Sequence, residues 1–191
     1  MQPEESLLGA VMMLAETLDG RDPAHQHSRM VGDYSRNTAS LLGLPAERID
    51  RIESAGVLHD LGKIGISDSV LFKPGRLDKS EWLEVQRHPE IGARILEHAG
   101  IEDIASWVIA HHEWMDGHGY PRMLRGAEIP LEARILAVGD AYEAMIIERP
   151  YSPAMLPAYA QEQLRLGSGT QFDPDVVNAF LAALPAEERG L

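Results

Sequence analysis

Cysteine is absent from this chain of 191 residues. Its absence excludes disulfides, thiolate zinc sites, iron–sulfur clusters and cysteine nucleophiles. Any metal ion must therefore be held by histidine and carboxylate side chains. Long apolar runs are also missing, because none approaches the roughly 18 residues that a transmembrane helix needs. The N-terminal residues carry acids and no basic segment, which argues against a secretory signal. We expect a cytoplasmic protein with no membrane span.

Basic residues are scarce relative to acidic ones. Lys and Arg total 17 against 30 Asp and Glu, and the formal net charge is −13. A surface of this sign disfavours binding to nucleic acid or to anionic membranes. If the substrate is a phosphate ester, its charge must be offset locally, by bound cations or by a small basic cluster.

Helical periodicity dominates the chain, and neither a repeat nor a convincing alternating strand pattern is present. Length and composition predict a single domain, 1–191, folded as an all-α bundle of about seven to nine helices. The segment 63–77 is expected to be a loop, and the Gly- and Pro-rich segment 116–130 a longer one. The predicted helices cover about 3–20, 25–42, 45–59, one from 78, 89–100, 102–115, 130–148, a short one after 157 and one from 173.

Histidines and aspartates stand in unusual places in this pattern. His59-Asp60 closes one apolar helix, His111-His112 is expected to end another, and Asp140 interrupts an apolar stretch. Taken singly, these could be helix caps, exposed polar pairs or a buried salt bridge. Adjacent helical residues point about 100° apart, so the histidine pair is expected to serve two neighbouring metal ions more easily than one.

Taken together, the motifs are dense and ordered. The segment 57–66 reads VLHDLGKIGI, 73–77 reads KPGRL, and 111–113 reads HHE. DG at 116–117 and GYP at 119–121 follow, and then come IPLEARI at 129–135, RPY at 149–151 and GTQFDP at 169–174. This order, from about residue 14 to residue 181, resembles the HD-GYP branch of the HD phosphohydrolases.

The resemblance implies a helical bundle of the HD phosphohydrolase type that binds two divalent ions. Iron or manganese is expected, with nickel, cobalt or zinc as alternatives that the same donors accept. Asp60 is implied as the residue that bridges the ions. The implied activity is hydrolysis of cyclic di-GMP to linear pGpG by a metal-bridging hydroxide, with GMP left open as a further product. The implied ligands are His27, His59, Asp60, His88, His111, His112 and Asp140.

Substrate contacts also follow from the resemblance. Asp60 and Lys63 are the implied catalytic residues, and Lys63 and Arg149 are the implied phosphate contacts. The GYP loop, with Gly119, Tyr120 and Pro121 as further candidate substrate contacts, is implied to shape the mouth of the site and to offer a docking surface for GGDEF-domain proteins. The three tryptophans, Trp82, Trp107 and Trp114, are expected in the core.

Departures from the family pattern bear on the number of metal ions. Pro23 stands where some members place an acid for a third ion, and Asp22 is displaced by one residue. Glu143 replaces the aspartate that usually follows Asp140. We expect two ions rather than three, with Asp22 and Glu143 as the residues that could still hold a third.

Two other functions are weighed against hydrolysis of cyclic di-GMP. One is a low-activity module that senses the dinucleotide or docks a cyclase. The other is an HD hydrolase of a different cyclic nucleotide. Retention of every implied ligand favours an enzyme. The chain is expected to be a catalytic HD-GYP domain without a regulatory domain, and its oligomeric state is left open.

Overall fold

The computed structural model describes residues 3–19, 27–147 and 154–188. These residues form an all-α bundle, as predicted, and the only β-type pairing among them is an isolated bridge between Ser168 and Phe172. Nine α-helices have seven or more residues and one is a single turn. They are α1 Pro3–Asp19, α2 His27–Leu41, α3 Ala46–Leu58, α4 Asp68–Leu71, α5 Lys79–Val85, α6 His88–His98, α7 Glu102–Val108, α8 Leu131–Ile146, α9 Pro157–Gly167 and α10 Pro174–Ala183, with 3₁₀ turns η1 Leu61–Gly65 and η2 Gly126–Glu128.

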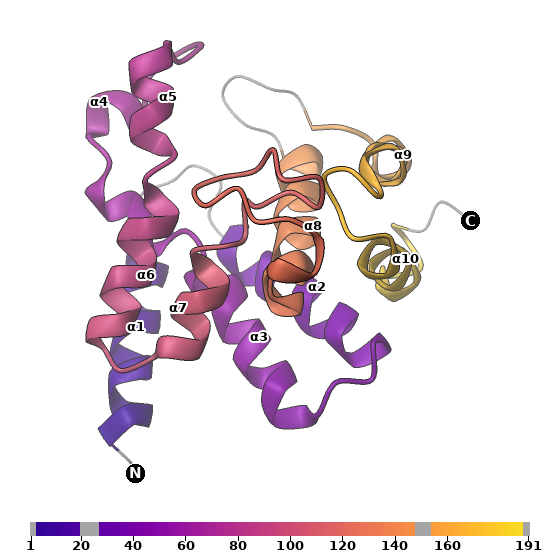
Figure 1. The fold of residues 1–191 in the computed structure, drawn as a ribbon, viewed down its shortest axis with the longest axis horizontal. Coiled ribbons are helices and arrows are strands. Elements are labelled where there is room, and N and C mark those ends of the chain that lie inside the picture. Colours follow the sequence, from indigo (N-terminus) through magenta and orange to yellow (C-terminus); the bar gives the residue numbers. More distant parts are fainter. Residues whose placement is uncertain (1–2, 20–26, 148–153, 189–191) are drawn as a thin grey trace.

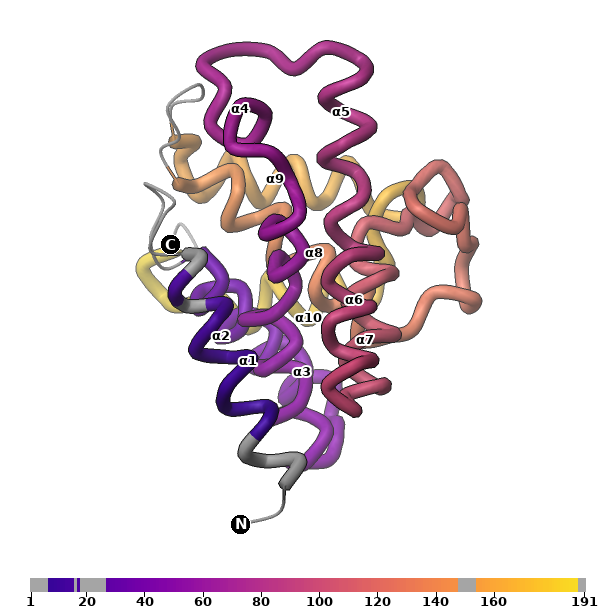
Figure 2. The backbone as a smooth tube through the Cα atoms, turned by 90° about the vertical axis from the view of Figure 1, so that its left-hand side faces the viewer, coloured from indigo at the N-terminus to yellow at the C-terminus, as the bar shows by residue number. Residues whose placement is uncertain are grey.

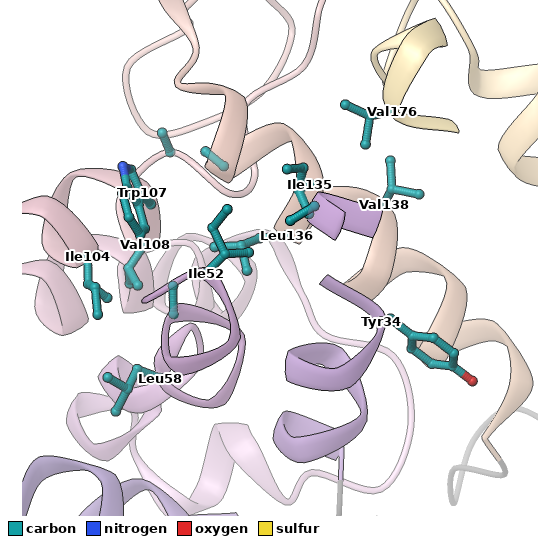
Figure 3. Close-up of a cluster of buried hydrophobic side chains, with 14 of the residues drawn as sticks. Tyr34, Ile52, Leu58, Ile104, Trp107, Val108, Ile135, Leu136, Val138 and Val176 are labelled. Carbon is teal, nitrogen blue, oxygen red and sulfur yellow. The ribbon is translucent and has the colours of Figure 1, made fainter. Parts of the chain in front are cut away.

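The centre of the bundle is formed by α2, α3 and α8. Helix α2 packs against α3, α8 and α10, while α6 packs against α7 and η1 (Figure 1). Apolar side chains from α3, α7 and α8 meet in one core (Figure 3), including Ile52, Leu58, Ile104, Val108, Ile135 and Leu136. Helix α8 is mostly apolar and its central residues are buried, so the carboxylate of Asp140 interrupts an otherwise apolar stretch.

Helices α4 and α5 extend beyond one end of the bundle, and α5 leads with a short turn into α6 (Figures 1 and 2). The predicted helix start at Asp78 is confirmed. Its side chain accepts hydrogen bonds from the backbone N–H groups of Ser80 and Glu81, and Glu81 completes a capping box.

The predicted loop 63–77 is wrong in part, because η1 and α4 fall within 61–71. The buried side chain of Val70 anchors the single turn of α4.

The helix predicted over 102–115 is also too long. Helix α7 ends at Val108, and turns carry the chain through His111 and His112. The His111 ring Nδ1 lies 2.5 Å from the Val108 carbonyl oxygen, which the backbone N–H of His112 would need to continue the helix. The Glu113 N–H instead bonds three residues back, to Ala110. A histidine side chain therefore replaces a helical hydrogen bond.

None of the helices in 3–19, 27–147 and 154–188 combines the length and the apolar character required to span a bilayer.

Gly62 allows η1 to touch the start of α6. A Cβ atom built on Gly62 would lie 1.9 Å from the His88 carbonyl oxygen and 2.5 Å from the Gly92 nitrogen. Both neighbours are backbone atoms, so neither can rotate away. This close approach sets the distance between the segment that carries Asp60 and the helix that begins at His88.

Gly62→Ala should therefore destabilise the fold. Forcing one extra carbon into a packed contact costs about 1–3 kcal/mol, and for a chain of this length that lowers Tm by roughly 3–10 °C. Gly9→Ala is the control: Gly9 is an exposed residue of α1 with nothing within 4 Å of a built Cβ, and alanine there should leave Tm unchanged or raise it slightly. Calorimetry on both variants makes the comparison, and equal Tm values would contradict the packing argument.

Candidate metal centre

Helix ends bring the predicted ligands together. His27 begins α2, His59 and Asp60 follow the end of α3, and His88 begins α6. The two remaining histidines follow α7, and Asp140 lies in the middle of α8. Within the described residues, their side chains form three overlapping groups whose ligand atoms lie within 4.8 Å of one another. The groups are His27, His59 and Asp60; His59, His111 and Asp140; and His88, His111 and His112.

Asp60 lies between two sides of this cluster. Its Oδ2 is 3.5 Å from Nε2 of His27 and 3.4 Å from Nε2 of His59. Its Oδ1 is 3.3 Å from Nε2 of His88. Asp140 Oδ1 joins the first side, at 3.4 Å from His27 and 3.7 Å from His59. The two oxygens of one carboxylate therefore face two different sets of imidazoles.

Backbone carbonyls hold three of the rings by the opposite nitrogen. Nδ1 of His59, His88 and His111 lies 2.7, 2.8 and 2.5 Å from a carbonyl oxygen three residues earlier in the chain. A carbonyl can only accept, so each Nδ1 carries the proton and each Nε2 is directed inward. Metal-binding histidines in proteins are usually oriented in this way by an outer partner.

The donor set fits cations. Nε2 of His88 and Nε2 of His111 face each other at 3.5 Å, although neutral rings with Nδ1 protonated present a lone pair there. Nε2 of His59 is buried and makes no hydrogen bond to the described residues. Lone pairs and carboxylate oxygens crowded in this way repel one another unless positive charge lies between them. Imidazole and carboxylate ligands suit first-row divalent ions.

The pKa values divide the histidines into two sets. Burial lowers the pKa of His27 and His59, but the neighbouring carboxylates of Asp140 and Asp60 outweigh it and raise the values to about 11 and about 9. Burial dominates elsewhere: it lowers the pKa of His88 and His111, and that of His112 falls to about 4. The second set is neutral and ready to coordinate, whereas protons on the first set compete with metal for the same carboxylates.

The structure places His111 and His112 in turns after α7 and not in a helix, so the geometry expected for the pair changes. Their rings lie 4.0 Å apart at 40°, and both contribute to the group that contains His88. The expectation for the pair assumed that adjacent side chains point about 100° apart, as they do in a helix. The turn after Val108 places the two side chains differently. His111 also belongs to the group with His59 and Asp140, so it faces both sides of the cluster.

Glu143 takes a different place from the one considered in the sequence. It is fully buried one turn after Asp140, and its carboxylate Oε2 accepts a hydrogen bond from Nδ1 of His27. It therefore orients His27 from behind, as the carbonyls orient the other rings. Spacing from Asp140 indicated the right region, but no sequence signal gave its partner. Asp22 lies outside the described residues.

Two charged residues were predicted to contact phosphate. The Lys63 ammonium forms an ion pair with Oδ2 of Asp60, and its side chain is 30% exposed. Burial would raise the pKa of Asp60, but the charges of Lys63 and His59 hold it well below its usual range. Arg149 lies outside the described residues.

The GYP loop is fastened to the histidine pair. The Tyr120 N–H donates to the His112 carbonyl at 3.1 Å, and the Tyr120 ring lies 4.9 Å from the His112 ring at 33°. Gly119 is buried beneath, where a Cβ would lie 2.5 Å from the same carbonyl oxygen. Pro121 is half-buried. Tyr120 therefore covers the His112 side of the cluster.

Glu113 is a structural residue that the sequence reasoning did not single out. Its side chain is 3% exposed and accepts the backbone N–H groups of Arg122 and Leu124 at 2.6 and 3.0 Å. This carboxylate holds the loop after Tyr120 in place. Its position directly after the histidine pair, before a Gly-rich loop, was the available signal.

Known proteins share both the sequence pattern and the fold. A family model described as "HD domain" matches residues 12–176. The chain is 40% identical over 184 residues to a cyclic di-GMP phosphodiesterase and 37% identical over 175 residues to 3'3'-cGAMP-specific phosphodiesterase 2, both of Vibrio cholerae serotype O1. These matches cover 88% and 90% of this chain but 37% and 34% of the relatives. The chain thus spans about a third of the length of these curated relatives.

Among solved structures, Bd1817, a HDG"Y"P protein from Bdellovibrio bacteriovorus, superimposes with a TM-score of 0.68 at 16% identity. The match covers 83% of this chain and 53% of that one, and at this identity it shows the fold alone. The family model and the relatives at 37–40% identity show that the chain belongs to the HD domain family, and its ordered motifs are those of the HD-GYP branch.

Proposed function

We propose that this chain is a metal-dependent phosphodiesterase that hydrolyses cyclic di-GMP to linear pGpG. The observation that carries the proposal is the placement of Asp60, whose Oδ2 faces His27 and His59 while its Oδ1 faces His88. The proposal treats the chain as one catalytic HD-GYP unit. Relatives named as cyclic di-GMP phosphodiesterases support it at 35–45% identity.

Two divalent ions are the cofactors that this donor set would hold. His27, His59 and Asp140 with Asp60 would form one half-site, and His88 and His112 with Asp60 would form the other. His111 lies between the two and joins the second through its contacts with His88 and His112. Such ions, when bound, activate water for attack on phosphorus and offset charge on the phosphoryl oxygens.

The chain's own residues then bind and position the diester. Lys63 can donate from its ammonium to a phosphoryl oxygen, because Asp60 holds it at the site while a third of its side chain reaches solvent. Tyr120 covers the cluster from the His112 side and limits where the substrate enters. These contacts offset locally the repulsion between a substrate anion and a chain of net charge −13.

A mixed cyclic dinucleotide is the second candidate substrate. Three relatives from Vibrio cholerae at 36–37% identity are named 3'3'-cGAMP-specific phosphodiesterases. A sensor without turnover is disfavoured, since the seven predicted ligands meet in one cluster. Docking of GGDEF-domain proteins on the GYP loop stays a prediction.

Anaerobic metal analysis combined with product chromatography tests the proposed function. The purified chain, reconstituted with Fe²⁺ or Mn²⁺, should convert cyclic di-GMP to pGpG, and chelation should abolish turnover. 3'3'-cGAMP measured in parallel decides between the two substrates. A metal-loaded protein that hydrolyses neither dinucleotide would overturn the proposal.

Asp60→Ala should empty both half-sites, because the proposed bridge serves both. Metal analysis after dialysis should find about two ions per wild-type chain, as in other dinuclear hydrolases, and far fewer than one in the variant. His27→Ala is the matched comparison, since it belongs to one half-site and should retain about one ion. If Asp60→Ala keeps both ions, Asp60 is not the bridge.

Glu143→Gln should weaken one half-site without changing the number of ions at saturation. Losing the carboxylate behind His27 is expected to cost about 10- to 100-fold in metal affinity, a typical effect for an outer partner. Glu132→Gln is the control, because Glu132 is also a buried acid of α8 but pairs with Arg48. A wild type with three ions that drops to two in Glu143→Gln would show instead that Glu143 is a ligand.

A further inference from the structure

Trp82 is not a core residue. Of the three tryptophans expected in the core, Trp107 is buried, whereas Trp82 and Trp114 are 46% and 36% exposed. Trp82 lies on α5, in the part of the molecule that extends beyond the bundle (Figures 1 and 2). Nearly half of a large apolar ring system is therefore left in water, beside the proposed site rather than inside the core.

Aromatic rings lead from Trp82 to the metal centre. The indole lies 6.5 Å from the Tyr120 ring at 76°, an edge-to-face contact. Tyr120 in turn lies 4.9 Å from His112. Trp82 is thus two ring contacts away from a proposed metal ligand, on the solvent side of Tyr120.

The helix that carries Trp82 is firmly held. Asp78 caps its start, Lys73 pairs with Glu81 at 2.6 Å, and Glu84 accepts the Ser67 N–H at 2.8 Å. Helix α5 ends at Val85, and a two-residue turn leads from it to His88 at the start of α6. The indole is therefore fixed relative to the metal centre, and its exposed part needs little ordering to bind a ligand.

We propose that the exposed part of the Trp82 indole, which contacts Tyr120, stacks a purine base of the cyclic dinucleotide whose phosphate lies at the metal centre. The inference rests on the proposed function and adds a base-binding subsite to it. Stacking on aromatic side chains is a general mode of binding unpaired bases, because every base has a π-face. Stacking also needs no positive charge on the protein. This suits an acidic chain in which Lys63, a cation beside the cluster, forms an ion pair with Asp60.

Trp82→Ala tests the subsite. The KM for cyclic di-GMP should rise roughly 5- to 100-fold, the range expected for losing one base stack, with little change in kcat. Hydrolysis of methyl p-nitrophenyl phosphate, which has no base, should be unaffected. Trp82→Phe should restore most of the affinity. Leu83→Ala is the matched control, since Leu83 is the next residue of α5 and is 55% exposed.

Calorimetric titration with cyclic di-GMP separates this inference from the proposed function. Binding that weakens in Trp82→Ala supports the subsite, even if the wild type shows no turnover and the proposed function fails. Turnover with the same KM and the same Kd in Trp82→Ala overturns the subsite and leaves the proposed function intact. A wild type that neither binds nor hydrolyses the dinucleotide overturns both.

Discussion

The position of the Asp60 carboxylate, between histidines on two sides, is the constraint on which the rest of the site depends. Asp60 has its oxygens toward His27 and His59 on one side and toward His88 on the other. This placement requires the end of α3 to lie against the start of α6, and Gly62 permits that contact because any side chain there would strike the backbone of His88. The ends of α2, α3, α6 and α7 and the middle of α8 then supply the remaining ligands.

Imidazole nitrogens and carboxylate oxygens crowd together in the cluster, and positive charge between them would relieve their repulsion. Carbonyl oxygens and Glu143 accept hydrogen bonds from the outer ring nitrogens of four histidines, so the inner nitrogens converge on the carboxylates of Asp60 and Asp140. The pKa values of His27 and His59 are raised for the same reason, because a protonated imidazole places positive charge beside the carboxylates. Under the proposed function, this local positive charge offsets the repulsion between an acidic chain and an anionic diester.

The motif resemblance predicted the members of the cluster, His27, His59, Asp60, His88, His111, His112 and Asp140, and missed what long-range contacts decide. The helix expected from residue 78 is α5. The end of α7 was missed because a His111 side chain takes a backbone acceptor. The partner of Glu143 and the exposure of Trp82 depend on packing between distant segments, which periodicity does not encode.

Anomalous diffraction from crystals grown with Mn²⁺ tests the role of Asp60 most directly. If Asp60 bridges two ions, two strong peaks should appear in the cluster, one coordinated by each carboxylate oxygen of Asp60, with His27, His59 and Asp140 on one ion and His88 and His112 on the other. A single peak, or two peaks of which only one touches Asp60, would contradict it.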